Sequence, residues 1–180
     1  TGSDETRSAA LADLNGDGRR DLLFINKIEG NSYGGGTTGS FAEAGRTTSF
    51  IYWGDSEGRF STERRQGLPT RRGADAHITS DLNANGYVDL LFVHGSGSPT
   101  VIYHGGPQGF SPENKSVVPD AMSATGRTAD LNRDGYLDLL LNSAVIYGHE
   151  SGYSAQDRFT FRPPAAYPGL FAKYPTSLVG

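Results

Sequence analysis

Residues 13–23 read DLNGDGRRDLL, and this stretch decides the fold because it recurs twice along the chain. Residues 81–91 read DLNANGYVDLL, and residues 130–140 read DLNRDGYLDLL. Internal repeats of this kind are typical of architectures in which one small structural unit is stacked several times. The sequence therefore predicts three copies of one unit.

A second motif follows each acidic stretch. It reads FIYWG at residues 50–54, VIYHG at 101–105 and VIYG at 145–148. An aromatic residue and a serine come next, and these pairs are Phe60-Ser61, Phe110-Ser111 and Tyr153-Ser154. Two independent motifs that recur in the same order indicate a true repeat. The first unit is longer because residues 30–45, which include GGGTTG at 34–39, have no counterpart and predict an inserted loop.

Each unit contains enough alternating and apolar segments for four short strands. In the second unit we predict strands at 76–81, 88–93 and 100–103, with a fourth inside 110–118. Four strands in a unit of roughly 50 residues, with no amphipathic helix between units, are typical of a β-propeller blade. We therefore predict an all-β propeller segment with three four-stranded blades at about 7–68, 74–119 and 123–162, and residues 163–180 as a link toward a further blade. A β-sandwich is the alternative, but it does not explain the repetition.

The composition agrees with many turns joined by short strands. The 180 residues include 25 Gly and 9 Pro, which a helical protein would not tolerate because each interior Gly costs about 1 kcal/mol relative to Ala. The net charge of -4 argues against nucleic-acid binding, and no apolar run reaches the roughly 18 residues that span a membrane. Cysteine is absent, which excludes disulfides and zinc-thiolate sites.

The acidic stretch has the donor pattern of a calcium loop. Positions one, three, five and nine carry side-chain oxygens in every copy, position six is always Gly, and position seven is expected to offer its backbone carbonyl. Alternate residues of a tight loop can turn their oxygens toward one hard cation, and the Gly, with a positive φ, closes the turn. The predicted ligands are Asp13, Asn15, Asp17, Arg19 and Asp21 in the first loop, Asp81, Asn83, Asn85, Tyr87 and Asp89 in the second, and Asp130, Asn132, Asp134, Tyr136 and Asp138 in the third.

Three such loops predict up to three bound calcium ions, whereas magnesium, which requires a strict octahedron and several waters, suits them less. The second loop offers two carboxylates where the others offer three, because Asn85 replaces an Asp, so we expect it to bind most weakly. An EF-hand is excluded, since its twelfth position needs a Glu and these loops have Phe24, Phe92 and Leu141 there. Ordinary Asx turns with self-satisfied side chains are the alternative.

The pattern Asp-x-Asn-x-Asp-Gly-x-x-Asp-Leu-Leu, followed by an aromatic-Gly hairpin, resembles the FG-GAP or VCBS repeat. The resemblance extends over about residues 7–161 and fits the VCBS branch better, because the Phe-Gly and Gly-Ala-Pro signatures are not intact. It implies the blades of a propeller like that of integrin α subunits and of many secreted bacterial proteins and lectins. It also implies calcium between the first and second strands of each blade, in agreement with the ligands above.

Three blades do not close a ring, because propellers have four to eight. We therefore expect further blades from the same chain or from neighbouring subunits. Calcium would then stabilise the fold at the concentrations found outside cells, which predicts secretion or cell-surface display. The expected role is a non-catalytic binding, adhesion or structural module that contacts protein or carbohydrate through loops of one propeller face. The alternative is an accessory or scaffold part of a secreted carbohydrate-active enzyme, similar to a polysaccharide lyase, whose active site lies elsewhere.

The residues that contact a ligand are less clearly marked than the metal loops. Besides segment 30–45, the candidates are Tyr33, Trp53, Tyr103 and His104, with packing between blades as the alternative for Trp53 and Tyr103. The arginines that suit an anionic glycan or a subunit, with a solvated surface as the alternative, are Arg64, Arg65, Arg71 and Arg72. The sequence has no HExxH motif. The histidines without a shared metal spacing are His77, His94, His104 and His149.

Overall fold

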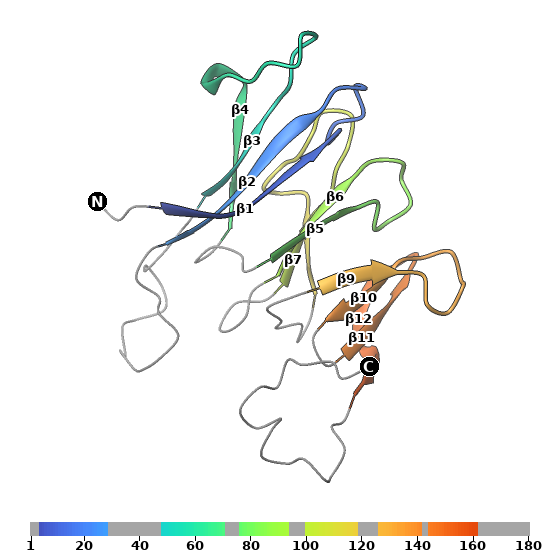
Figure 1. The fold of residues 1–180 in the computed structure, drawn as a ribbon. Coiled ribbons are helices and arrows are strands. Elements are labelled where there is room, and N and C mark those ends of the chain that lie inside the picture. The colour runs from blue at the N-terminus through green and yellow to red at the C-terminus, as the bar shows by residue number, and fades with distance from the viewer. Residues whose placement is uncertain are drawn as a thin grey trace.

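The computed structural model describes residues 4–28, 48–70, 76–93, 100–118, 126–141 and 144–161 (Figure 1). These residues form strands and one short 3-10 turn at Thr62–Arg64, so the described chain is all-β, as predicted. The inserted segment 30–45, the link 163–180, Arg71, Arg72 and His94 lie outside the described residues. No helix in the described ranges is long and apolar enough to cross a lipid bilayer.

The described residues form three antiparallel sheets of four strands each. Sheet 1 contains β1 (Asp4–Ala12), β2 (Asp21–Ile28), β3 (Thr48–Tyr52) and β4 (Arg65–Pro69). Sheet 2 contains β5 (Ala76–Ser80), β6 (Asp89–Val93), β7 (Thr100–Tyr103) and β8 (Lys115–Val118). Sheet 3 contains β9 (Gly126–Ala129), β10 (Asp138–Leu141), β11 (Ala144–His149) and β12 (Gly152–Thr160). In every sheet the strands pair in chain order, so each repeat unit folds into its own sheet.

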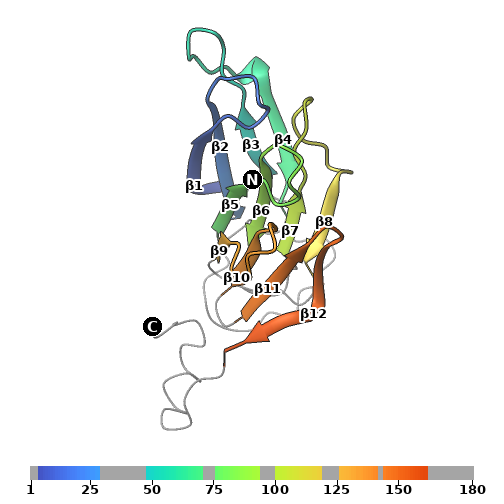
Figure 2. The ribbon, with the colours of Figure 1, turned by 90° about the vertical axis from the view of Figure 1, so that its right-hand side faces the viewer.

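The prediction of three four-stranded units is confirmed by these sheets. In the second unit β7 has the predicted bounds, while the strands predicted at 76–81 and 88–93 each extend one residue beyond β5 and β6. The fourth strand occupies only the end of segment 110–118, because a turn precedes it in which the N–H of Asn114 donates to the carbonyl of Ser111 at 3.1 Å. Within the described residues the sheets form an open arc and not a closed ring (Figures 1 and 2).

Adjacent sheets pack face to face around two hydrophobic clusters. The cluster between sheets 1 and 2 contains Leu14, Leu23, Ile25, Ile51, Leu68, Leu90, Phe92, Tyr103 and Phe110. The cluster between sheets 2 and 3 contains Leu82, Leu91, Val93, Ile102, Val118, Leu139, Leu141 and Ile146. Because side chains alternate along a strand, Leu90 and Phe92 face sheet 1, whereas Leu91 and Val93 face sheet 3. We call the face of a sheet that is turned toward the preceding sheet its rear face, and the opposite face its forward face.

The strand register identifies equivalent residues in the three sheets. Tyr103 and Ile146 each lie opposite the first leucine of the second strand in their sheets. Ile146 therefore occupies the place of Tyr103, and Tyr147 occupies the place of His104. The shared letters VIY at 101–103 and 145–147 are thus not equivalent in space, because the third unit has one residue fewer before its glycine.

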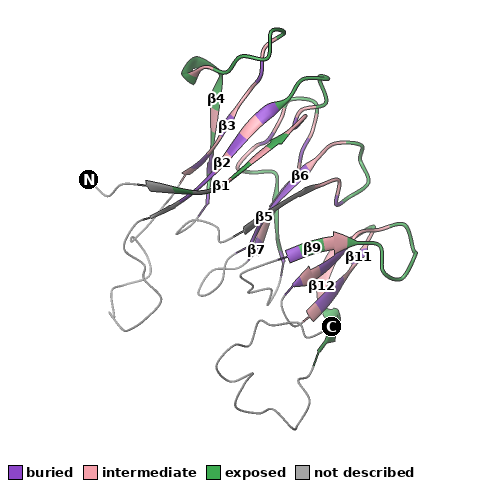
Figure 3. Ribbon diagram, viewed as in Figure 1, coloured by how far each residue is buried: buried purple, intermediate pink, exposed green. Residues whose placement is uncertain are grey.

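Burial follows the same repeat. The buried side chains line the strands, while the loop between the first and second strands of each sheet is largely exposed (Figure 3). All three of these loops project from the same side of the arc (Figure 1). The fold therefore presents the three acidic motifs together on one side.

Candidate metal centres

The three acidic loops span residues 13–20, 81–88 and 130–137, between the first and second strands of their sheets. The leucine at position two anchors the first two loops, because Leu14 and Leu82 are buried in the clusters between sheets. Its counterpart Leu131 is half exposed, at 51%. Loops one and two are therefore fixed by a neighbouring sheet in a way that loop three is not.

The first aspartate of each loop turns its carboxylate into the loop. Asp13 accepts hydrogen bonds from the backbone N–H groups of positions four, five and six at 2.8, 3.1 and 2.8 Å. Asp81 accepts from positions five and six at 3.1 and 2.8 Å, and Asp130 accepts from the same positions at 3.1 and 3.0 Å. The backbone of each loop is thus wrapped around the position-one carboxylate.

The side chains at positions three and five lie beside each other. Asn15 Nδ2 is 3.2 Å from Asp17 Oδ2, and Asn132 Nδ2 is 2.8 Å from Asp134 Oδ2. In all three loops, the Oδ1 atom of position three accepts the N–H of position five at 3.1, 3.2 and 3.1 Å. The position-five oxygen then accepts the N–H of position seven at 2.9, 2.8 and 2.9 Å. These are Asx-turn contacts, and they hold the polar side chains of each loop close together.

Two residues of each loop adopt a left-handed backbone. At position six the glycine has φ of 82°, 87° and 94° in the three loops, which confirms the positive φ predicted for it. Position four is also left-handed, with φ of 74° at Gly16, 56° at Ala84 and 63° at Arg133. The sequence reasoning missed this second turn, although Gly16 in the first copy was a signal for it.

The position-nine aspartate is fully buried and forms the base of each loop. Asp21, Asp89 and Asp138 are each 0% exposed. In each residue Oδ2 accepts the backbone N–H of position two, at 2.9, 2.9 and 2.7 Å. In each residue Oδ1 accepts the N–H of the glycine that ends the aromatic-Gly motif, at 3.0, 2.8 and 2.9 Å. The two repeated sequence motifs are therefore joined through this carboxylate.

The glycine of the aromatic-Gly motif is required by a close backbone approach. A Cβ atom on Gly105 would lie 2.1 Å from the carbonyl oxygen of Val88, just before the buried aspartate. The equivalent distances at Gly54 and Gly148 are both 2.3 Å. No side chain fits at such a distance, so the recurrence of glycine follows from packing.

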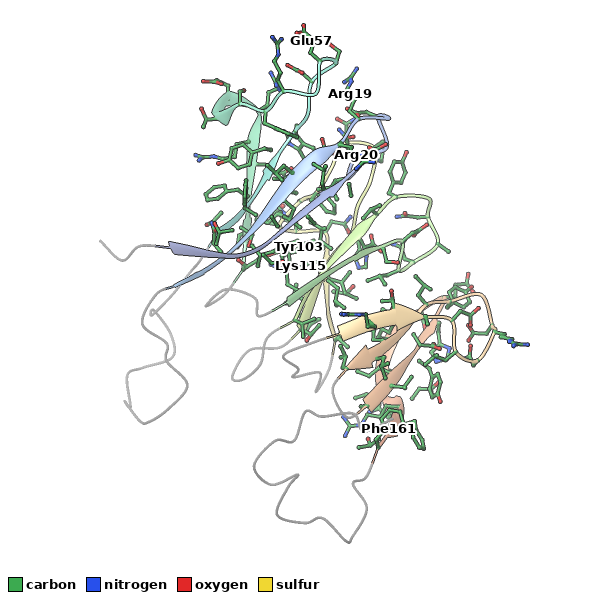
Figure 4. The ribbon with its side chains drawn as sticks, in the orientation of Figure 1. Arg19, Arg20, Glu57, Tyr103, Lys115 and Phe161 are labelled. Atoms are coloured by element: carbon green, nitrogen blue, oxygen red, sulfur yellow. The ribbon has the colours of Figure 1, made fainter. Side chains whose placement is uncertain are left out.

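Negative charge accumulates in the first loop. Burial raises the pKa of Asp21, two backbone N–H donors oppose the rise, and the carboxylates of Asp17 and Asp13 add to it. Asp17 pairs with Arg19 at 3.3 Å on the exposed side of the loop, where Figure 4 labels Arg19. Asp13 forms no ion pair with another described residue. A bound cation would relieve the repulsion among these carboxylates.

The donor set suits a hard divalent cation, although the described residues contain no preformed cluster of carboxylates. In the described part of the chain, no group of three or more His, Cys, Asp or Glu side chains is arranged as a metal site. Each predicted cage instead combines two or three carboxylates with Asn amides and a backbone carbonyl. A carboxylate has about four lone-pair sites, so position nine keeps acceptor capacity beyond its two backbone bonds. Every predicted donor is an oxygen atom, which is the ligand that calcium takes.

His104 lies beside the second loop. Its Nδ1 atom is 3.4 Å from Asn83 Nδ2 and 3.6 Å from Asp89 Oδ1, and its Nε2 atom is 2.7 Å from Ser116 Oγ. The separation from Asp89 is longer than a hydrogen bond. Ser116, His104 and Asp89 therefore do not form the hydrogen-bonded relay of a nucleophilic serine.

The aromatic candidates Trp53 and Tyr103 pack between sheets. Tyr103 belongs to the first cluster and is 2% exposed, and Trp53 packs against the same cluster. A Cβ atom on Gly109 of the second sheet's hairpin would lie 3.0 Å from the Trp53 ring. Arg64 bonds to the carboxylate of Asp55 at 3.2 Å and so supports its own hairpin. These contacts agree with the packing alternative for the two aromatic side chains.

The fold and the loops define a β-rich module built from repeats that each contain one acidic loop. A family model described as FG-GAP-like repeat matches residues 13–92 and 81–141, which together include all three loops and more than half of the chain. The chain therefore belongs to the FG-GAP-like repeat family, and the resemblance noted in the sequence is confirmed. A comparison with curated proteins gives no match.

Proposed function

We propose that this chain is a calcium-stabilised segment of a β-propeller that serves outside the cell as a binding, adhesion or structural module. The observation that carries the proposal is the threefold recurrence of one oxygen-lined loop on one side of the arc (Figure 1). The carboxylates at positions one and nine also accept backbone N–H groups, so the support comes from the recurrence of the whole set of oxygen donors and not from the carboxylates alone.

Calcium fits the loops because their predicted donors are all oxygen and because the carboxylate at position one of each loop is not balanced by an ion pair within the described residues. Asp13, Asp81 and Asp130 each face the interior of a loop and form no ion pair with another described residue. A cation that binds only the folded chain stabilises it by about 2.7 kcal/mol when present at 100 times its dissociation constant. Up to three ions would therefore have a large effect on a fold whose stability is of the order of 5–15 kcal/mol.

The propeller part of the proposal rests on the way the sheets follow one another. Sheet 1 packs its forward face on the rear face of sheet 2, and sheet 2 packs its forward face on the rear face of sheet 3, as blades of a propeller do. Further blades, from the same chain or from neighbouring subunits, would continue the arc into a ring of four to eight. The partner is a protein or carbohydrate that contacts loops on one face, and membrane insertion and nucleic-acid binding are not part of the role.

A non-catalytic role is the reading we favour. An accessory or scaffold part of a secreted carbohydrate-active enzyme is the second candidate, since a scaffold of this kind needs no catalytic group of its own. The geometry around His104 agrees with the non-catalytic choice, because its Nδ1 atom is 3.6 Å from Asp89 Oδ1, which is too far for the carboxylate to orient the imidazole as in a catalytic triad.

Thermal unfolding tests the proposal. The chain is stripped with a chelator and then melted with calcium, with magnesium or without a divalent ion. We expect calcium to raise Tm clearly more than magnesium, and Asp130→Asn to reduce the rise. Asp157→Asn, on the exposed part of β12, is the matched control and should leave the calcium effect intact. An identical Tm with and without calcium would overturn the proposal.

A further inference from the structure

The rear face of sheet 1 repeats the rear face of sheet 2. Phe24 and Tyr52 form an edge-to-face ring pair with centroids 5.7 Å apart and planes at 90°. Phe92 and Tyr103 form the same pair in sheet 2, with centroids 5.8 Å apart and planes at 78°. Both pairs occupy equivalent positions, because each tyrosine lies opposite the first leucine of the second strand.

The two copies of this face differ in what covers them. Phe92 and Tyr103 are 0% and 2% exposed because sheet 1 lies on them. Phe24 and Tyr52 are only partly buried, and no described strand packs against their face (Figure 1). Leu11, on the same face beside Leu22, is 49% exposed. Sheet 1 therefore has the apolar surface of a sheet-to-sheet interface, and among the described residues no sheet covers it.

A basic residue marks the outer edge of both copies. Arg65, opposite Tyr52, lies with its guanidinium 4.5 Å from the centroid of the Phe50 ring. Lys115 holds the equivalent place opposite Tyr103, and its ammonium is 5.7 Å from that ring. The resemblance of the two faces thus extends from the aromatic pair to its cationic border.

The forward face of sheet 3 repeats the surface that covers such a pair. Leu140, Val145 and Phe159 lie opposite one another across β10, β11 and β12. The first two hold the places of the aliphatic residues that sheets 1 and 2 use on their forward faces, Leu23 with Ile51 and Leu91 with Ile102. Of these three, Val145 is 4% exposed, Leu140 is partly buried and Phe159 is 53% exposed. Figure 4 places Phe161, which is 39% exposed, at the end of the arc away from sheet 1.

We propose that the forward face of sheet 3 in one copy docks on the rear face of sheet 1 in a second copy, by the same packing that joins sheets 1 and 2. This inference rests on the proposed propeller. The interface is heterologous, because different surfaces of the two copies meet. Such an interface generates a ring when the rotation that relates one copy to the next closes on itself. Two copies, each with the three sheets that the described residues form, would place six sheets in the ring, within the range of known propellers. Arg127, opposite Leu140, lies at the inner edge, where its stem can cover apolar surface while its charge stays in water.

Sedimentation of the full chain at several concentrations tests the interface. We expect a species of twice 19.2 kDa for the unmodified chain. Leu11→Glu places a charge on the apolar face of sheet 1, and Phe159→Glu places one on the apolar face of sheet 3. Each substitution should weaken association at least tenfold. Val117→Glu is the matched control, because Val117 is an equally exposed apolar residue, at 53%, on the internal sheet 2. A monomer at every concentration, or equal loss of association in the control, would overturn the proposal.

Mixing the two variants tests the head-to-tail arrangement. The Leu11→Glu chain keeps an intact sheet 3 face, and the Phe159→Glu chain keeps an intact sheet 1 face. One native junction can therefore form in the mixture, and association should return although neither variant associates alone. Failure of the mixture to associate, while circular dichroism shows both variants folded, would contradict the proposal. Running the samples with calcium and with a chelator separates this result from that of the calcium proposal, which is read from the change in Tm.

Discussion

The Oδ1 atom of Asp89 lies 2.8 Å from the backbone nitrogen of Gly105, and this one contact joins the acidic loop to the end of the third strand. The same bond recurs at 3.0 Å in sheet 1 and at 2.9 Å in sheet 3. A residue that was predicted only as a metal ligand is thus also a buried structural acceptor. The two roles make different predictions, because the structural one does not need a cation.

Asp89→Asn should destabilise the chain even without calcium. The substitution replaces one carboxylate oxygen by an NH2 group, which leaves the N–H of either Leu82 or Gly105 without an acceptor. An unsatisfied buried donor costs about 1–3 kcal/mol. Urea unfolding in the presence of a chelator measures the loss. Asp81→Asn is the comparison, since its hydrogen bonds lie at the exposed surface and water can replace them, and an equal cost for both variants would contradict the structural role.

Gly105→Ala should be strongly destabilising, whereas Gly106→Ala should be nearly neutral. An added Cβ at Gly105 meets the carbonyl oxygen of Val88 at 2.1 Å, while at Gly106 the nearest atom is 4.0 Å away. Forcing a methyl group into a packed site costs about 1–3 kcal/mol. The free energies of unfolding of the two neighbouring variants provide the test. Similar values for both variants would show that the carbonyl oxygen of Val88 does not exclude a side chain at position 105.

Asn85→Asp should strengthen calcium binding at the second loop. The substitution restores the third carboxylate that loops one and three already have, and the affinity of such loops depends on the number of charged ligands. We expect a gain of roughly tenfold, which corresponds to about 1.4 kcal/mol. Calorimetric titration of this variant beside the unmodified chain measures it. A decrease in affinity would show that the Asn85 amide is itself the better ligand.

Asp55 should contribute a pH-dependent stabilisation of the first hairpin. The N–H of Arg59 donates to this carboxylate at 2.8 Å and, with the other contacts of the turn, lowers the pKa of Asp55 from 3.8 to about 2. Because the pKa is lower in the folded chain, the stabilisation by the Asp55 carboxylate is fully present above the unfolded value of 3.8. It is lost as the pH falls through the folded value of about 2. The carboxyl carbon shift of Asp55, followed by NMR, reports the titration directly. A titration midpoint near 3.8 would show that the hydrogen bonds to the Asp55 carboxylate are not formed in solution.

The division into sheets was predictable from the sequence because it depends on repetition. The strand β7 at Thr100–Tyr103 and the left-handed glycine at position six both follow from local patterns of apolar and turn residues. The open arc follows from the small number of repeats. The start of β8 was placed less well, although Ser111 followed by Pro112 is a turn signal, and the N–H of Asn114 does donate to the carbonyl of Ser111 before the strand begins.

The candidate site was only half predictable, since its loops are local and its supports are not. Spacing alone identified the oxygen side chains of each loop. It did not indicate that Asp138 is buried, because the partner that buries it, Gly148, comes from another strand. The left-handed turn at Arg133 was likewise hidden, since a charged residue at that position gives no local sign of its backbone. Long-range contacts of this kind need the folded chain.

Calorimetric titration of calcium into the chelator-stripped chain tests the central claim most directly. The account predicts up to three sites, two of similar affinity from the first and third loops and one weaker site from the second. Asp13→Asn and Asp130→Asn should each weaken or remove one of the two tighter sites and leave the others. If no heat of binding is found, or if the sites persist in these variants, the acidic loops are turns that hold no calcium and the proposed function is wrong.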